Sequence, residues 1–253
     1  MESHLVTGAT GLVGMHIVLD LLNQNKKVCA TFTKNSNRSI IKHVFNHYGF
    51  SNYYDKVKWI KMDLEDVTEV YQAIKGVDFV YHSGAIVSFN KSDYEQMRRI
   101  NIEGTRAMCS AALSSQIKRF VYFSSIHAFQ QEPIDRKLTE ERLLVTDPKS
   151  SHYDLTKARA EDEVKKAHKA GLSTIVLNPT GILGPYDFKP SRMGQLLKNI
   201  MNQKTLLTIN AGFNWVDVRD VAKSAVNCIV RGIDGQNYIL PGHWASMPHL
   251  SSL

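Results

Sequence analysis

The 253-residue sequence has no run of eighteen apolar residues, so we expect no transmembrane helix. Its amino terminus lacks the basic, apolar and small-residue succession of a secretory signal peptide. Its cysteines, Cys29, Cys109 and Cys228, are far apart and odd in number, which fits free thiols in a reducing compartment. Neither they nor the histidines have metal-ligand spacing. We therefore expect a cytoplasmic protein with no metal site.

The sequence also has little clustering of charge, although its formal net charge is +7. The densest basic segments, residues 97–100 and 165–169, lie within helical patterns and are expected to be solvated helix faces. A phosphorylated ligand would account for part of the positive excess. We therefore expect a small-molecule partner rather than a nucleic acid or a membrane.

Short apolar segments alternate with amphipathic ones along the first 180 residues, with no internal repeat. Expected strands are residues 4–8, 27–33, 57–62, 78–84, 119–125 and 173–179, and expected helices are 12–25, 39–48, 68–75, 92–115 and 153–169. Such alternation predicts an α/β fold with a doubly wound parallel sheet covered on both faces.

The pattern loosens after about residue 180. Residues 184–194 contain two prolines and two glycines, which predicts a loop leading to a helix near 192–203. We expect residues 1–180 to form a dinucleotide-binding domain. Residues 181–253 are expected to form a substrate-binding region that is interleaved with the sheet and truncated at its carboxyl end.

The segment "VTGATGLVG", residues 6–14, places three glycines between the first expected strand and the first expected helix. In a strand–turn–helix setting, Gly8 permits a tight turn, Gly11 lets the backbone approach a pyrophosphate, and Gly14 allows close helix–strand packing. The helix amino terminus then offers unpaired N–H groups to the phosphates. This segment predicts a dinucleotide-binding loop.

Tyr153 and Lys157 are four residues apart, and therefore share one face of an expected helix. A phenol with a pKa near ~10 is a poor proton shuttle at neutral pH, and a neighbouring ammonium is expected to lower that pKa. The pair is thus a candidate acid/base unit. Ser124 and Ser125, at the end of an earlier strand, supply hydroxyl hydrogen-bond donors.

Seven segments occur in the order typical of an extended short-chain dehydrogenase/reductase, and the resemblance extends over residues 4–241. They are "VTGATGLVG", "YHSGAIVSF", "NIEGT", "VYFSS", "YDLTK", "LNPTGILGP" and "WVDVRDVA". The chain most resembles the dihydroflavonol-reductase and hydroxysteroid-dehydrogenase branch of this epimerase/dehydratase superfamily. The resemblance implies a Rossmann-type domain with a smaller carboxyl-terminal substrate region.

The resemblance also implies roles for individual residues. Tyr153 would be the catalytic acid/base, Lys157 would hold the nicotinamide ribose, and Ser125 would hydrogen-bond the substrate oxygen. The implied cofactor-binding residues are Gly8, Thr10, Gly11, Leu12, Gly14, Thr33, Lys34, Arg38, Asp63, Leu64, Gly84, Ala85, Lys157, Asn178 and Pro179. Asn101 falls at a structural asparagine, and we assign it no catalytic role. His127 is left open as a substrate contact.

The cofactor preference follows from an absence of acidic residues. Proteins that prefer NAD place Asp or Glu about 20 residues beyond the glycine loop, on the ribose 2′-hydroxyl. Residues 28–54 contain no acidic residue, whereas Lys34 and Arg38 could pair with a 2′-phosphate. We therefore expect NADP to be preferred over NAD.

The expected function is hydride transfer between a nicotinamide and a carbonyl or secondary alcohol of a bulky, uncharged substrate. Nucleotide-sugar epimerisation or dehydration is an alternative, as is a non-catalytic NAD(P)-sensing regulatory protein. Against the sugar alternative, Phe213 occupies the place where those enzymes usually carry a diphosphate-binding arginine, and Arg219 is expected to pair locally. Relatives also suggest a possible homodimer.

Overall fold

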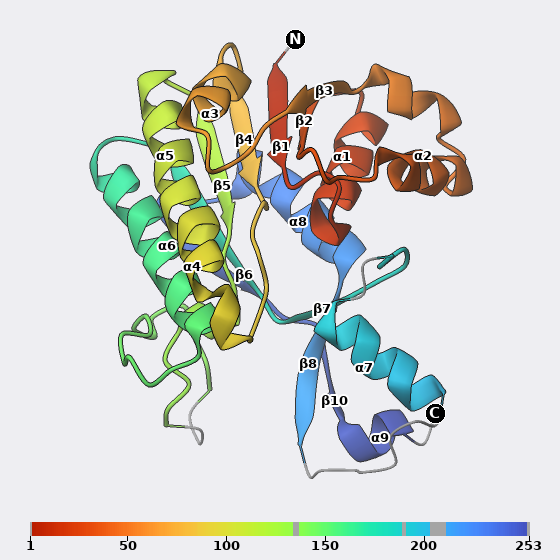
Figure 1. Cartoon of the computed structure of the whole chain (residues 1–253), viewed down its shortest axis with the longest axis vertical. Helices are drawn as coiled ribbons and strands as arrows, with labels where there is room; N and C mark the ends of the chain where they lie inside the picture. Colours follow the sequence, from red (N-terminus) through yellow and green to blue (C-terminus); the bar gives the residue numbers. More distant parts are fainter. Residues whose placement is uncertain (1, 134–136, 189–190, 203–210, 252–253) are drawn as a thin grey trace.

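A parallel sheet forms the centre of the computed structural model, which describes residues 2–133, 137–188, 191–202 and 211–251 (Figure 1). Within these residues, seven strands are ordered β3-β2-β1-β4-β5-β6-β9 and every neighbouring pair is parallel. The strands are β1 (Ser3–Thr7), β2 (Lys27–Phe32), β3 (Lys58–Lys61), β4 (Phe79–His82), β5 (Arg119–Phe123), β6 (Thr174–Pro179) and β9 (Asn237–Leu240). This Rossmann-like arrangement confirms the predicted fold class.

Helices cover both faces of the sheet, as Figure 1 shows. On one face lie α1 (Leu12–Asn23), α2 (Arg38–His47) and α8 (Val218–Arg231), and on the other lie α3 (Val67–Ile74), α4 (Tyr94–Met97), α5 (Gly104–Ser114) and α6 (His152–Lys169). Two apolar clusters fill the space between helices and sheet, one on each side. Central strands such as β1, β4 and β6 are buried along their whole length, as expected for a parallel sheet covered on both faces.

A smaller unit follows β6 and lies beyond the carboxyl ends of the strands (Figure 1). It contains a three-stranded sheet of β7 (Gly181–Leu183), β8 (Gly212–Asp217) and β10 (His243–Ser246), with α7 (Arg192–Met201) and α9 (Met247–Ser251) beside it. The chain returns to the main sheet twice, through α8, which packs on α1, and through β9. The loop expected at 184–194 and the helix after it are present, although residues 189–190 and 203 lie outside the described residues.

The three cysteines are free and buried. No helix among the described residues is both long enough and apolar enough to cross a bilayer.

Candidate active site

Most of the predicted site residues lie at the carboxyl edge of the main sheet because they follow, or end, a parallel strand. The glycine loop follows β1, the Thr33–Lys34 pair follows β2, and Asp63 follows β3. Gly84 and Ala85 come after β4, Ser125 comes after β5, and Asn178 and Pro179 close β6. Residues as distant in the chain as Gly8 and Pro179 are thereby brought to one edge.

Two glycines of the loop are required by the fold itself. Gly8 has a φ of +64°, and a Cβ there would lie 2.8 Å from the backbone of Gly84. A Cβ at Gly14 would lie 2.4 Å from the Gly8 carbonyl oxygen and 2.8 Å from the Ala9 Cα. Only glycine accommodates both approaches without moving backbone. The loop and the first turn of α1 therefore pack too closely for any side chain.

Gly11 differs from its two neighbours. Its φ is −88°, and the nearest atom to an added Cβ is the Gly8 carbonyl oxygen at 3.3 Å, so a methyl group there would require only a small shift of this neighbour. Gly11 is also the N-cap of α1, where no side chain caps the helix. An uncapped amino terminus beside a side-chain-free position fits a pyrophosphate, which would lie against the backbone N–H groups.

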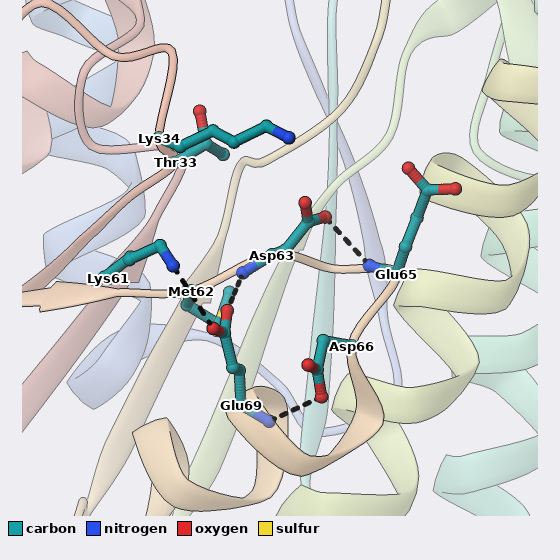
Figure 2. Close-up of a pocket in the computed structure, with 8 residues that line it drawn as sticks. All are labelled: Thr33, Lys34, Lys61, Met62, Asp63, Glu65, Asp66 and Glu69. Carbon is teal, nitrogen blue, oxygen red and sulfur yellow. Dashed lines mark hydrogen bonds and ion pairs between the residues drawn. The ribbon is translucent and has the colours of Figure 1, made fainter.

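A pocket of about 300 Å³ lies where the adenosine end of such a dinucleotide is expected (Figure 2). It is lined by Thr33, Lys34, Lys61, Met62, Asp63, Glu65, Asp66 and Glu69. The Asp63 carboxylate accepts one hydrogen bond, from the Glu65 N–H at 3.1 Å. Asp66, rather than Asp63, caps α3 by accepting the N–H groups of Thr68 and Glu69. Helix capping therefore does not account for Asp63.

The turn after β2 is held by a residue that the sequence did not single out. Ser36 Oγ accepts the Thr33 N–H at 3.0 Å and is hydrogen-bonded to Thr10 Oγ1 at 3.2 Å, which ties this turn to the glycine loop. Lys34 lines the pocket, and its side chain extends over it in Figure 2. Arg38 does not line the pocket, since its guanidinium stacks over the Phe32 ring at 4.3 Å.

Helix α6 carries Tyr153 and Lys157 on its inner face. The helix begins at the Ser151 N-cap, whose hydroxyl accepts the Asp154 N–H at 3.1 Å. Tyr153 is 8% exposed, and burial raises the pKa of its phenol to about 12, while the nearby Ser125 side chain, as a hydrogen-bond partner, acts in the opposite direction. The structure thus brings the side chains of Tyr153 and Ser125 together.

Lys157 does not act on the phenol as its spacing suggested. Its ammonium donates to the Phe123 carbonyl oxygen at 2.6 Å, and it contributes nothing to the shifted pKa of Tyr153. The expectation of a lowered pKa for Tyr153 is therefore corrected, because burial raises this pKa by more than the Ser125 hydrogen bond lowers it. Burial also lowers the pKa of Lys157 itself, to about 8.

The Asn178 side chain is occupied within the protein. Its amide donates to the Ser125 carbonyl oxygen at 3.1 Å and to the carboxylate of Glu161 at 2.9 Å, and it is fully buried. If this segment contacts a cofactor, the contact would therefore be made by other atoms than the Asn178 amide. Sequence reasoning missed Glu161 and its second amide partner, Asn237.

Other conspicuous residues have structural partners. Asn101 exchanges two hydrogen bonds with the Ile86 backbone and so holds the loop after β4. His82 lies between Thr7 and Thr105, and burial lowers its pKa to about 3. His127 is partly exposed, with its Nδ1 3.2 Å from the Asp154 carboxylate and its ring centroid 5.9 Å from that of Tyr153.

A doubly wound sheet with this glycine loop and a Ser–Tyr–Lys cluster defines a dinucleotide-binding α/β protein of the extended short-chain dehydrogenase/reductase type. The model of the NAD dependent epimerase/dehydratase family matches residues 4–239. The chain belongs to this family, which confirms the resemblance found in the sequence.

Similar proteins include two that are named as reductases and one that is named as a sterol demethylase protein. The putative dihydroflavonol 4-reductase of Synechocystis sp. is 29% identical over 246 residues, which cover 96% of this chain and 68% of that protein. Sterol demethylase protein B of Methylococcus capsulatus is 28% identical over 238 residues, covering 94% and 69%. The 2-alkyl-3-oxoalkanoate reductase of Stenotrophomonas maltophilia is 30% identical over 224 residues, covering 88% and 62%.

Solved structures share the fold. The crystal structure of gox2253 matches all of this chain and 73% of its own, with a TM-score of 0.87 and 29% identity. DesIV, a dTDP-glucose 4,6-dehydratase from Streptomyces venezuelae solved with NAD and TYD bound, has a TM-score of 0.84 at 20% identity, covering 99% of this chain and 79% of its own. At that identity, the likeness to DesIV shows the fold alone.

Proposed function

We propose that this chain is a nicotinamide-dependent oxidoreductase that reduces the carbonyl of a bulky, largely uncharged substrate. The observation that carries the proposal is the cluster of Ser125, Tyr153 and Lys157 at the same sheet edge as the glycine loop. The family and the named reductases among its relatives support the class of reaction. A turnover screen with both nicotinamide cofactors against ketones, hydroxysteroids and nucleotide sugars tests the proposal.

The state of Tyr153 is compatible with a role as proton donor. Because the pKa of its phenol is raised to about 12, the group is protonated at neutral pH and can donate to a developing alkoxide. Ser125, its hydrogen-bond partner, would bind the same substrate oxygen and orient it. A bound nicotinamide supplies the hydride in such reactions. Lys157 would hold the nicotinamide ribose through its ammonium.

The cofactor would lie along the strand ends that carry the predicted residues. Gly8, Gly11 and Gly14, with Thr10 and Leu12 between them, would hold the pyrophosphate at the start of α1. Asp63 and Leu64 would contact the adenine, and Gly84 and Ala85 would leave room for ribose and phosphate. Pro179 would border the nicotinamide.

We infer a preference for NADP from the turn after β2. Lys34 lines the adenosine-side pocket and has no hydrogen bond or ion pair within the part of the chain described, whereas the pocket's other lysine, Lys61, lies 3.8 Å from Glu69. A lysine without a counter-ion is available to a 2′-phosphate. Arg38 would have to leave the Phe32 ring to contribute.

Lys34→Ala is expected to weaken NADP binding about tenfold and leave NAD binding nearly unchanged, since one charge-assisted contact is lost. Lys61→Ala removes a pocket lysine that already has a partner, and should change the two affinities little and equally. Fluorescence titration of both reduced cofactors measures this. Tighter binding of NAD than of NADP by the unaltered protein would overturn the preference.

The substrate class follows from what the smaller unit presents. Phe213, on β8, is partly exposed and packs edge-on against Trp215 with ring centroids 5.5 Å apart. Arg219, the nearest arginine in sequence, is bonded to the Asp217 carboxylate through Nε at 2.9 Å. An aromatic face without a free guanidinium favours a flat, uncharged substrate over a nucleoside diphosphate.

Calorimetric titration with uridine- and thymidine-diphosphate sugars, with cofactor present, is therefore expected to show no binding tighter than about 1 mM. Such weak binding corresponds to a free energy of only ~−4 kcal/mol. Micromolar binding of any of these sugars would instead favour the epimerase or dehydratase alternative.

A further inference from the structure

Glu161 is the fully buried acidic residue of α6, with 0% of its surface exposed. It lies four residues after Lys157, and therefore one turn further along the same helix face. Burying a carboxylate is unfavourable unless hydrogen bonds and opposite charges compensate. A neutral side chain would fill this position at lower cost, so the presence of a charge there needs an explanation.

The contacts of Glu161 come from three elements. Its Oε2 accepts from the Asn178 amide of β6 at 2.9 Å, and its Oε1 accepts from the Asn237 amide of β9 at 2.7 Å. Lys165, one turn further along α6, lies 3.0 Å from Oε1 and is partly exposed. The two amides are neutral, so the partly exposed ammonium of Lys165 is the only formal charge paired with this carboxylate among the described residues.

Within the described part of the chain, Glu161 is the charged group that acts on Lys157, and the other groups around this lysine are neutral. Its ammonium donates to the Phe123 carbonyl oxygen and lies 5.1 Å from the centre of the Tyr122 ring on β5. Burial raises the pKa of Tyr122 and lowers that of His82 on β4 to about 3, so both are neutral at physiological pH. Tyr153, on the same helix, is neutral as well.

We propose that Glu161 is a positioning residue whose buried carboxylate keeps the Lys157 ammonium charged, and so able to hold the nicotinamide ribose. The inference rests on the role given to Lys157 in the proposed function. Burial alone pushes Lys157 toward the neutral amine, and Glu161 is the group that acts in the opposite direction. Lys165 partly offsets Glu161 from the other side.

The test is the pH dependence of cofactor affinity, followed by fluorescence titration between pH 6.5 and 10. In the unaltered protein, affinity should fall as the pH rises through the Lys157 pKa of about 8. Glu161→Gln removes the negative charge, lowers that pKa, and should move the midpoint down by about one pH unit. Binding at pH 8 should then be about fivefold weaker.

Lys165→Met provides an opposite change that leaves the Glu161 amide contacts in place. Removing this cation strengthens the field of Glu161 at Lys157, so the midpoint should move upward, by less than one unit because water screens a partly exposed charge. In Glu161→Gln, a glutamine amide would face the donor amides of Asn178 and Asn237, which could prevent folding. In that case Lys165→Met provides the test of the inference.

Glu163→Gln is the matched control. Glu163 is on the same helix and is paired with Arg106 and Lys166, so its loss should lower thermal stability without moving the midpoint. A purely structural role of Glu161 would produce the same result as this control. An unmoved midpoint in Glu161→Gln or, where that variant does not fold, in Lys165→Met overturns the inference.

Lys157→Met separates this inference from the proposed function. If its cofactor affinity no longer changes across the same pH range, Lys157 is the titrating group and the variants above report on Glu161. If the pH dependence persists in Lys157→Met, the role of Lys157 itself is wrong, and the inference about Glu161 fails with it.

Discussion

Replacing Tyr153 with phenylalanine is expected to reduce turnover by about 10²–10⁴-fold while cofactor affinity stays within about twofold of the unaltered value. The phenol is the proposed proton donor, and its ring, packed beside Phe89 and His127, would remain in place. Steady-state rates and fluorescence titration of the reduced cofactor separate the two effects. The loss should therefore appear in kcat and leave the cofactor dissociation constant alone.

Tyr81→Phe makes the same chemical change at a buried tyrosine of β4 whose hydroxyl contacts His4 at 3.3 Å. Losing that hydrogen bond should lower the free energy of unfolding by about 1 kcal/mol and leave turnover unchanged. Near-normal activity in Tyr153→Phe would remove the basis for the proposed mechanism.

Gly14→Ala is expected to lower the stability of the fold, whereas Gly11→Ala is expected to weaken cofactor binding. At Gly14 the methyl would meet backbone at 2.4 Å, so the free energy of unfolding should fall by about 3 kcal/mol. For a chain of this size that corresponds to roughly 6–12 °C in Tm. At Gly11 the closest internal atom is 3.3 Å away, so stability should change by less than about 1 kcal/mol.

Gly11→Ala should nevertheless weaken cofactor binding at least about tenfold, because its methyl stands where the pyrophosphate would approach the backbone. Thermal unfolding without cofactor and titration with cofactor measure the two quantities independently. Unchanged cofactor affinity in Gly11→Ala would mean that the phosphates do not lie against this loop.

The first six strands of the main sheet, β1 to β6, could be predicted from short segments rich in apolar, β-branched and aromatic residues. The strands β7 to β10 were not predicted. β8, for example, has the sequence "GFNWVD", and it is held by pairing with β7 and β10 rather than by its own propensity. β9 pairs with β6, which lies almost sixty residues earlier in the chain. A local sequence pattern does not predict such a distant pairing.

The site shows the same division between local and distant information. Tyr153 and Lys157 were predicted from their spacing along one helix, which does not depend on how the rest of the chain folds. Their pKa values depend on burial, which spacing does not report, so the expected lowering for Tyr153 was wrong. Glu161 did carry a signal, since it continues the Tyr153–Lys157 face by one more turn, but its amide partners come from two distant strands.

The most direct test of the account follows the hydrogen that is transferred. The protein is incubated with NADPH deuterated at nicotinamide C4 and with a panel of bulky ketones, and the products are examined by mass spectrometry and NMR. We expect an alcohol that carries one deuterium on the former carbonyl carbon, and at least about a hundredfold less of it from Tyr153→Phe in the same time. Tight cofactor binding without label transfer to any ketone would contradict the account, as would turnover of a nucleotide sugar without net consumption of cofactor.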